Sequence, residues 1–147
     1  MGLTKLANQK EELLEEIRAR FHELGQRFTR EREALLGVLL LSSKAWTPQE
    51  LYDQTQADEN VGLTTTYRTL ETLTRIGFAQ VFLIEGELRY RLCAPTHHHH
   101  LVCTACKGID EFAGCDLDLL DVGSFQATSH RIEIFGLCKN CQTGATG

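Results

Sequence analysis

Two short motifs, Cys103-Thr104-Ala105-Cys106 and Cys138-Lys139-Asn140-Cys141, are the most informative part of this 147-residue sequence. A C-x-x-C turn places two thiolates on one side of a metal ion, and two such turns supply the four soft ligands of a tetrahedral zinc site. Because the protein fills all four positions, none is left for water, so the predicted zinc is structural rather than catalytic. The metal would join the start of a C-terminal domain to its end.

Two other interpretations of these cysteines stay open, namely two disulfides or a redox pair. Disulfides suit oxidising compartments, but the charged N-terminus has no apolar segment followed by a small-residue cleavage site. No apolar run approaches 18 residues, so we expect a cytoplasmic chain without a membrane partner. A redox motif needs only one C-x-x-C pair, at a helix N-terminus. The spacing therefore favours zinc.

The chain before the cysteines predicts four helices. Their expected ranges are 9–25, 29 to about 43, 48–56 and 65–76. Thr29 and Thr64 are candidate N-caps, and Thr47-Pro48-Gln49-Glu50 reads as a capping box with proline in the first turn. Residues 58–62 read as a turn between the third and fourth helices.

Two strands are expected next, at 79–84 and 87–92, joined by a turn at Glu85-Gly86. Helices followed by a hairpin are typical of a winged helix-turn-helix domain, placed at residues 1–92. A proline-containing hinge is expected at 93–96, and a metal-binding dimerisation domain at 97–147. Strands expected there at 98–102, 108–112 and 130–135 make the fold class α+β. A core of about 50 residues usually needs a metal or a partner chain.

Four consecutive histidines, His97 to His100, precede the first cysteine pair. In a strand, alternate side chains face opposite sides, so His98 and His100 would serve one metal site and His97 and His99 another. Cys93, Glu111, Asp118 and His130 are the donors available to complete them. The run could instead be a tag or a solvated loop, His130 could be a buried histidine, and Asp118 could belong to a solvated acidic face.

The fourth expected helix opens with Thr65, Thr66, Tyr67 and Arg68. A recognition helix presents such N-terminal side chains to the major groove, and Arg89 in the hairpin could add a phosphate contact. Alternatively, Tyr67 is a core residue and the threonines are only caps. The net charge of −5 gives no general attraction to DNA, although 12 of the 15 basic residues lie in residues 1–92.

Together these residues resemble the ferric uptake regulator family over nearly the whole chain. The resemblance rests on five stretches: Arg27-Phe28-Thr29 with Arg32, the run at 65–70, Tyr90-Arg91-Leu92, His100-Leu101-Val102-Cys103, and Gly136-Leu137-Cys138 with Cys141. It implies a winged helix, a C-terminal α/β dimerisation domain, and a homodimer that binds operator DNA when a regulatory metal is bound. It also implies that the chain is not an enzyme.

Within the family, the resemblance is strongest to the zinc uptake regulators. Iron sensors place a glutamate where this chain has Arg91 and a histidine near Trp46, whereas Cys93 lies where zinc sensors carry a ligand cysteine. A thiolate with imidazoles also suits Zn²⁺ better than Fe²⁺ or Mn²⁺. The implied regulatory ligands are Cys93, His98 and His100; the fourth is open between the Gln80 position and Glu111, with Glu111 preferred.

The resemblance also implies a further metal site made by His97, His99, Asp118 and His130. Two departures from the family pattern are visible: Lys107 precedes the glycine that usually follows the second cysteine, and the segment between Asp121 and His130 is short. In addition, Cys115 matches no motif. Cys115 is therefore either a buried thiol or an auxiliary donor.

The sequence leads us to expect a zinc-responsive repressor of zinc uptake genes. Its rivals are an iron or peroxide sensor of the same family, a zinc hydrolase or deaminase, and a zinc-storage protein that does not bind DNA. A hydrolase or deaminase needs an open metal position, and the deaminase motif H-x-E followed by P-C-x-x-C is absent from the sequence.

Overall fold

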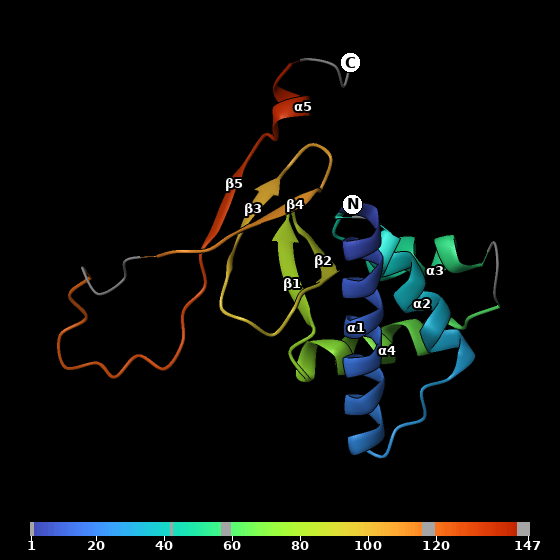
Figure 1. Ribbon diagram of the computed structural model, residues 1–147. Coiled ribbons are helices and arrows are strands. Elements are labelled where there is room, and N and C mark those ends of the chain that lie inside the picture. The colour runs from blue at the N-terminus through green and yellow to red at the C-terminus, as the bar shows by residue number, and fades with distance from the viewer. Residues whose placement is uncertain (1, 42, 57–59, 116–119, 144–147) are drawn as a thin grey trace. The chain divides into compact units, whose positions relative to one another are not determined.

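The computed structural model describes residues 2–41, 43–56, 60–115 and 120–143. The chain forms two compact units, residues 1–95 and 96–147. The expected hinge at 93–96 spans this division, and its action as a hinge stays a prediction. Within the described ranges, the first unit has four helices and a small sheet, and the second has a small sheet and one short helix, so the expected α+β class is confirmed (Figure 1).

Four helices make most of the N-terminal unit: α1 (Gly2–Glu23), α2 (Arg30–Leu41), α3 (Pro48–Thr55) and α4 (Leu63–Arg75). The capping box is confirmed, because the Thr47 hydroxyl accepts from the Glu50 amide and the Glu50 carboxylate accepts from the Thr47 amide. The expected cap at Thr64 is wrong. Helix α4 begins two residues earlier than expected, at Leu63, with Gly62 as an N-cap that has no side chain to accept a hydrogen bond.

The hairpin after α4 has the expected bounds, with β1 (Ala79–Ile84) antiparallel to β2 (Glu87–Leu92). Glu85 and Gly86 both have positive φ, 51° and 84°, which matches the twist of a two-residue hairpin turn. Trp46 extends this wing because its backbone exchanges two hydrogen bonds with Tyr90, at 2.8 and 2.7 Å.

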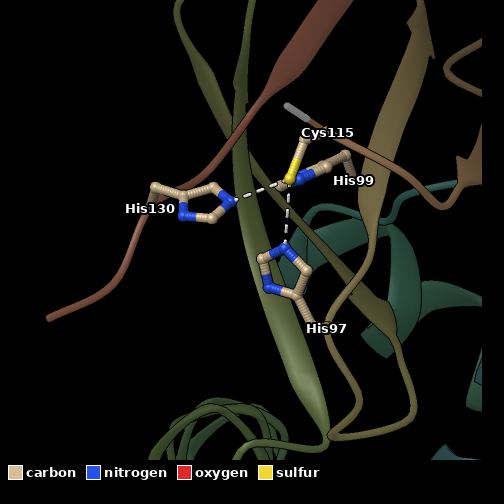
Figure 2. Close-up of side chains that lie close together, drawn as sticks. All are labelled: His97, His99, Cys115 and His130. Carbon is tan, nitrogen blue, oxygen red and sulfur yellow. Dashed lines mark hydrogen bonds between the residues drawn. The ribbon is translucent and has the colours of Figure 1, made fainter. Parts of the chain in front are cut away.

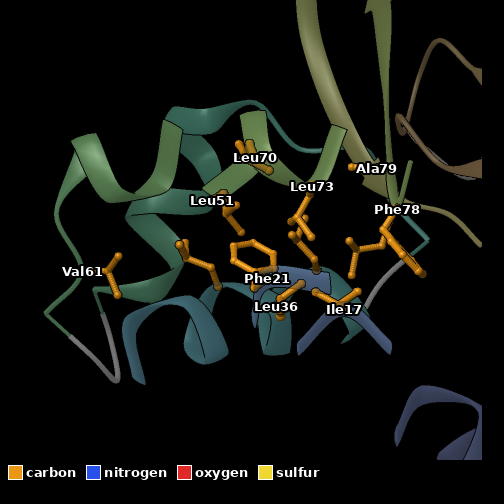
Figure 3. Close-up of a cluster of buried hydrophobic side chains, with 12 residues drawn as sticks. Ile17, Phe21, Leu36, Leu51, Val61, Leu70, Leu73, Phe78 and Ala79 are labelled. Atoms are coloured by element: carbon orange, nitrogen blue, oxygen red, sulfur yellow. The ribbon is translucent and has the colours of Figure 1, made fainter. Parts of the chain in front are cut away.

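An apolar cluster holds the helices of the N-terminal unit together (Figure 3). Every helix and the base of the wing contribute to it, and its buried members are Ile17, Phe21, Leu35, Leu36, Leu39, Leu51, Val61, Leu70, Leu73, Phe78, Ala79 and Leu92. Phe21 is fully buried and meets Phe28 edge to face, with ring centroids 5.6 Å apart. This core holds α4 against the unit through Leu70 and Leu73, while the side of α4 that carries Tyr67 is exposed.

The C-terminal unit is a three-stranded sheet followed by a short helix. Strand β3 (His99–Cys103) lies between antiparallel β4 (Ile109–Phe112) and parallel β5 (Glu133–Gly136), and α5 (Lys139–Gln142) comes last. The strands expected at 98–102, 108–112 and 130–135 are thus present with different bounds: β3 lies one residue later, β4 is one residue shorter, and β5 is shorter and shifted towards the C-terminus. The described residues 120–132 form neither helix nor strand.

None of the helices within the described residues combines the length and the apolar character that crossing a lipid bilayer requires. Helix α1 has 22 residues but carries charged side chains along its length.

Candidate metal centres and nucleic-acid interface

The four cysteines of the two C-x-x-C motifs converge in the C-terminal unit. Parallel pairing puts Cys103, at the end of β3, opposite Gly136 of β5. Cys138 follows as the N-cap of α5, and Cys141 lies in that helix. The four sulfur atoms lie within 4.8 Å of one another, and the sulfurs of Cys106 and Cys138 are 3.9 Å apart. This arrangement fits the tetrahedral thiolate set of structural zinc, with no position left open.

Hydrogen bonds make these thiols unequal. Burial alone would raise the pKa of Cys103, but backbone hydrogen bonds from Cys106, Cys138 and Ala105 lower the pKa to about 6. The side-chain hydrogen bond with Cys138, with burial, raises the pKa of Cys141 to about 12. One thiolate therefore forms readily and disfavours the next, so four thiolates together need a cation to balance them.

The turn after Cys106 explains the displaced glycine. Lys107 itself takes the left-handed conformation, with φ of 64°, which L-residues with a side chain seldom adopt. A Cβ at Gly108 would lie 3.2 Å from the Cys106 sulfur, and the Gly108 amide donates to that sulfur at 3.4 Å. Glycine is thus favoured at position 108 because the backbone there comes close to the sulfur of Cys106.

His98, His100 and Glu111 form a second group of donors. His100 pairs with Glu111 across the β3–β4 ladder, the His98 Nε2 lies 3.6 Å from a Glu111 carboxylate oxygen, and the rings of His98 and His100 are 4.6 Å apart. His98 Nδ1 lies 2.7 Å from the Thr96 carbonyl oxygen. A proton on Nδ1 would be held by that carbonyl and would leave Nε2 ready for a metal.

Cys93 belongs to the N-terminal unit, just after β2. Its backbone amide donates to the Phe78 carbonyl at 2.9 Å, and the Arg91 guanidinium lies 3.5 Å from its sulfur. Gln80, the alternative position for a fourth ligand, lies on β1, and its side-chain oxygen is buried without a hydrogen-bond partner in the described part of the chain.

A third group contains the other two histidines of the run, His97 and His99, with Cys115 and His130 (Figure 2). Burial, then the neighbouring histidines His97, His130 and His98, lowers the pKa of His99, which favours the neutral ring that binds metals. His130 is exposed and is not a core residue. Asp118, the expected carboxylate ligand, lies outside the described residues. The sequence did not assign Cys115 to a donor group, because strand alternation gives no information on a residue outside a strand.

The outer side of α4 carries part of the expected DNA-contacting set. Tyr67 is 52% exposed, so it is a surface residue rather than a core residue, and Arg68 is also exposed. Thr65 is half-buried beside an open pocket lined in part by Arg27 and Arg32. Burial and the charge of nearby Arg68 lower the pKa of Arg32, so a local cationic patch exists although the chain is acidic.

Two residues expected to contact DNA are placed elsewhere. Thr66 is fully buried, and its hydroxyl donates to the Gly62 carbonyl at 3.1 Å. Arg89 is 5% exposed and makes two hydrogen bonds to the Glu50 carboxylate, at 2.9 and 3.1 Å. A buried guanidinium held by a carboxylate is a structural ion pair, so the expectation for these two residues is corrected. Arg27 and Arg32 carry no sequence pattern that predicts a place in the cationic patch beside Thr65, because their closeness to α4 is a tertiary feature.

Comparison with known proteins identifies the family. The model of the ferric uptake regulator family matches residues 23–135. The chain belongs to the ferric uptake regulator family. Its members are metal-responsive, DNA-binding transcriptional regulators and not enzymes.

Relatives in the family have different names. The chain is 37% identical over 126 residues to the zinc uptake regulation protein of Mycobacterium tuberculosis, covering 81% of this chain and 97% of the relative. It is 31% identical over 138 residues to the ferric uptake regulation protein of Campylobacter upsaliensis, covering 88% of each. A zinc uptake regulator solved with zinc and DNA is similar with a TM-score of 0.66 and 26% identity, covering 94% of this chain and 98% of that one.

Proposed function

We propose that this member of the family is a zinc-responsive regulator that binds operator DNA when zinc is plentiful and represses genes of zinc uptake. The observation that carries the proposal is the donor set of imidazoles His98 and His100 with the carboxylate of Glu111. Cys93 lies five residues before His98 in the chain and would add a thiolate. Thiolate and imidazole together favour Zn²⁺ over Fe²⁺ and Mn²⁺.

The proposed mechanism is a metal-dependent choice of orientation. Cys93 belongs to the DNA-binding unit and the other three ligands to the C-terminal unit, so one zinc ion bound by all four would restrain the hinge at 93–96. The ion favours DNA binding only if it binds the operator-competent orientation more tightly than the others. By linkage, operator DNA must then tighten zinc binding by the same factor.

We infer that the operator-binding form is a homodimer joined through the C-terminal units. That unit leaves large apolar side chains of its sheet exposed: Leu101 at 42%, Ile134 at 53% and Phe135 at 47%. Apolar surface of this kind is commonly covered by a partner. Sedimentation should give a dimer for the chain, and the pair Leu101→Arg with Ile134→Arg should give a monomer that retains its zinc. A chain that sediments as a monomer at micromolar concentration overturns the inference.

The DNA-binding test starts from random duplexes, because the operator is unidentified. Duplexes are selected with the whole protein in Zn²⁺, Fe²⁺ or Mn²⁺, and the enriched duplex then serves as the probe in anisotropy titrations. We expect Zn²⁺ to tighten binding at least tenfold, or about 1.4 kcal/mol. An equal response to Fe²⁺ or Mn²⁺ rejects zinc sensing, and no enrichment with any metal points to storage.

Cys93→Ser and His100→Gln should each abolish the zinc response. His22→Gln is the matched control, because His22 is exposed and belongs to none of the donor groups. Each variant must retain one zinc per chain at the four cysteines. An unchanged zinc response in Cys93→Ser would remove that residue from the regulatory site.

A further inference from the structure

The group of His97, His99, Cys115 and His130 has the geometry of a complete metal site. The Cys115 sulfur lies 3.2 Å from His130 Nε2 and 3.5 Å from His97 Nε2, and the donor atoms of all four residues lie within 4.8 Å of one another. Zinc bonds of about 2.3 Å to sulfur and 2.0–2.1 Å to nitrogen, at tetrahedral angles, place sulfur and nitrogen about 3.5 Å apart. The observed spacings are close to that value.

Hydrogen bonding among the four side chains leaves one buried nitrogen of the group without a partner in the described residues. The Cys115 sulfur is close to two imidazoles at once, where a thiol could donate to one and accept from the other and a thiolate could share a metal ion with both. The ring of His99 is 1% exposed, and its Nε2 has no hydrogen-bond partner in the part of the chain that the structure describes. Leaving a buried polar nitrogen unpaired is costly. If Nε2 bound a metal, the ring proton would lie on Nδ1. Nδ1 could then no longer accept from the Ile132 amide, whose 3.3 Å contact is already long for a hydrogen bond.

We propose that Cys115 is the fourth ligand of a zinc site completed by His97, His99 and His130. Three imidazoles and one thiolate form a soft donor set that selects Zn²⁺ over Fe²⁺ and Mn²⁺, whereas a carboxylate in the place of the thiolate would widen the choice. The site is separate from the four cysteines and from the proposed regulatory group. It does not depend on whether the chain binds DNA.

The site would also fix an irregular part of the fold. Cys115 follows β4 by three residues, and His130 precedes β5 by three. The chain between the two strands has no helix or strand in its described residues. A metal bound at the four side chains would tie both ends of this connection to His97 and His99 at the start of β3. Loss of the site should therefore loosen the connection more than the sheet.

Cobalt spectroscopy in a Cys93→Ser background tests the proposal. The sequence has six cysteines, so with zinc retained at the C-x-x-C sites, Cys115 is the one thiol left to bind added Co²⁺. We expect one equivalent of Co²⁺ to give a sulfur-to-metal charge-transfer band and the intense visible bands of a tetrahedral ion. Zinc content is measured throughout, to show that Co²⁺ has not entered the four-cysteine site.

Two double variants decide the identity of the ligand. Cys93→Ser with Cys115→Ser should lose the charge-transfer band, and Cys93→Ser with Asp118→Asn should keep it. Bound cobalt without that band, a band that survives removal of Cys115, or a band lost on removing Asp118 would each overturn the proposal. Zinc at the four cysteines shows that each variant is folded. Because no DNA is present, the result is independent of the regulator proposal.

Discussion

The two units of this protein are stabilised by different means. The N-terminal unit buries twelve apolar residues in one cluster, so its stability comes from apolar surface removed from water. The described part of the C-terminal unit buries few apolar side chains, among them Val102 and Ile109, and groups thiols and imidazoles in its place. A unit of about 50 residues has too little interior for a large core, so we expect metal bonds at these donor groups to stabilise it in place of burial.

Removing metal should give the largest effect and should affect the C-terminal unit selectively. Structural zinc contributes roughly 10–16 kcal/mol of apparent binding energy in small zinc domains. After treatment with a strong chelator, amides of β3, β4 and β5 should lose their protection from hydrogen exchange, while α2 and α4 stay protected. Cys138→Ser should behave in the same way without a chelator. Equal loss of protection in both units would contradict separate stabilisation.

A cavity in the apolar cluster should have the opposite selectivity. Phe21→Ala removes a fully buried ring and should cost about 3–5 kcal/mol. Trp46, the only tryptophan, lies in this unit and reports its unfolding in urea by fluorescence. Leu41→Ala is the control because that side chain is 79% exposed, and it should cost less than about 0.5 kcal/mol. The zinc content of both variants should match the wild type.

The buried ion pair should have an intermediate effect. Arg89→Met leaves the Glu50 carboxylate without its guanidinium, and should cost about 2 kcal/mol because Glu50 remains partly exposed. Arg75→Met, which breaks only the exposed pair with Glu71, should change the unfolding free energy little. If Arg89 contacted phosphate instead, Arg89→Met would reduce the salt dependence of DNA binding, and we expect that dependence to stay unchanged.

The same pair gives stability a pH dependence. Burial alone would raise the pKa of Glu50, but hydrogen bonds from Arg89 and Lys44 outweigh it and hold the pKa below the ordinary 4.5. A carboxyl group whose pKa is lower in the folded state stabilises the fold at pH values above its unfolded-state pKa. This contribution fades as the pH falls below about 4.5. Urea unfolding across that range should show the loss in the wild type and less of it in Arg89→Met.

The smallest expected change concerns the turn at the cysteines. Lys107→Gly removes the cost of a side chain at φ of 64° but also the Lys107 ammonium contact with the Thr104 carbonyl. The net gain should be about 0.5 kcal/mol in the C-terminal unit, measured as slower amide exchange in β3. Lys107→Ala keeps the strain and loses the contact, so it should give no gain.

Local patterns in the sequence sufficed for the elements and for part of the site. The β1–β2 hairpin follows from residue alternation and its turn, and the capping box at Thr47 from four adjacent residues. Alternation also separated His98 and His100 from His97 and His99, because neighbouring side chains in a strand face opposite ways. The proposed cap at Thr64 was wrong by less than one helical turn, since helix ends depend weakly on any one residue.

What only the tertiary structure decided lies between residues far apart in the chain. The sequence suggests that Arg89 binds phosphate. In the folded chain, Arg89 is buried and pairs with Glu50, which lies 39 positions away in the sequence. Cys115 has no local pattern, and its closeness to His130 and His97 arises only in the folded chain. The sequence by itself determined which residues can bind zinc, because that is a property of side-chain chemistry and spacing. Which donors share one ion depends on distances in space, and those the fold alone sets.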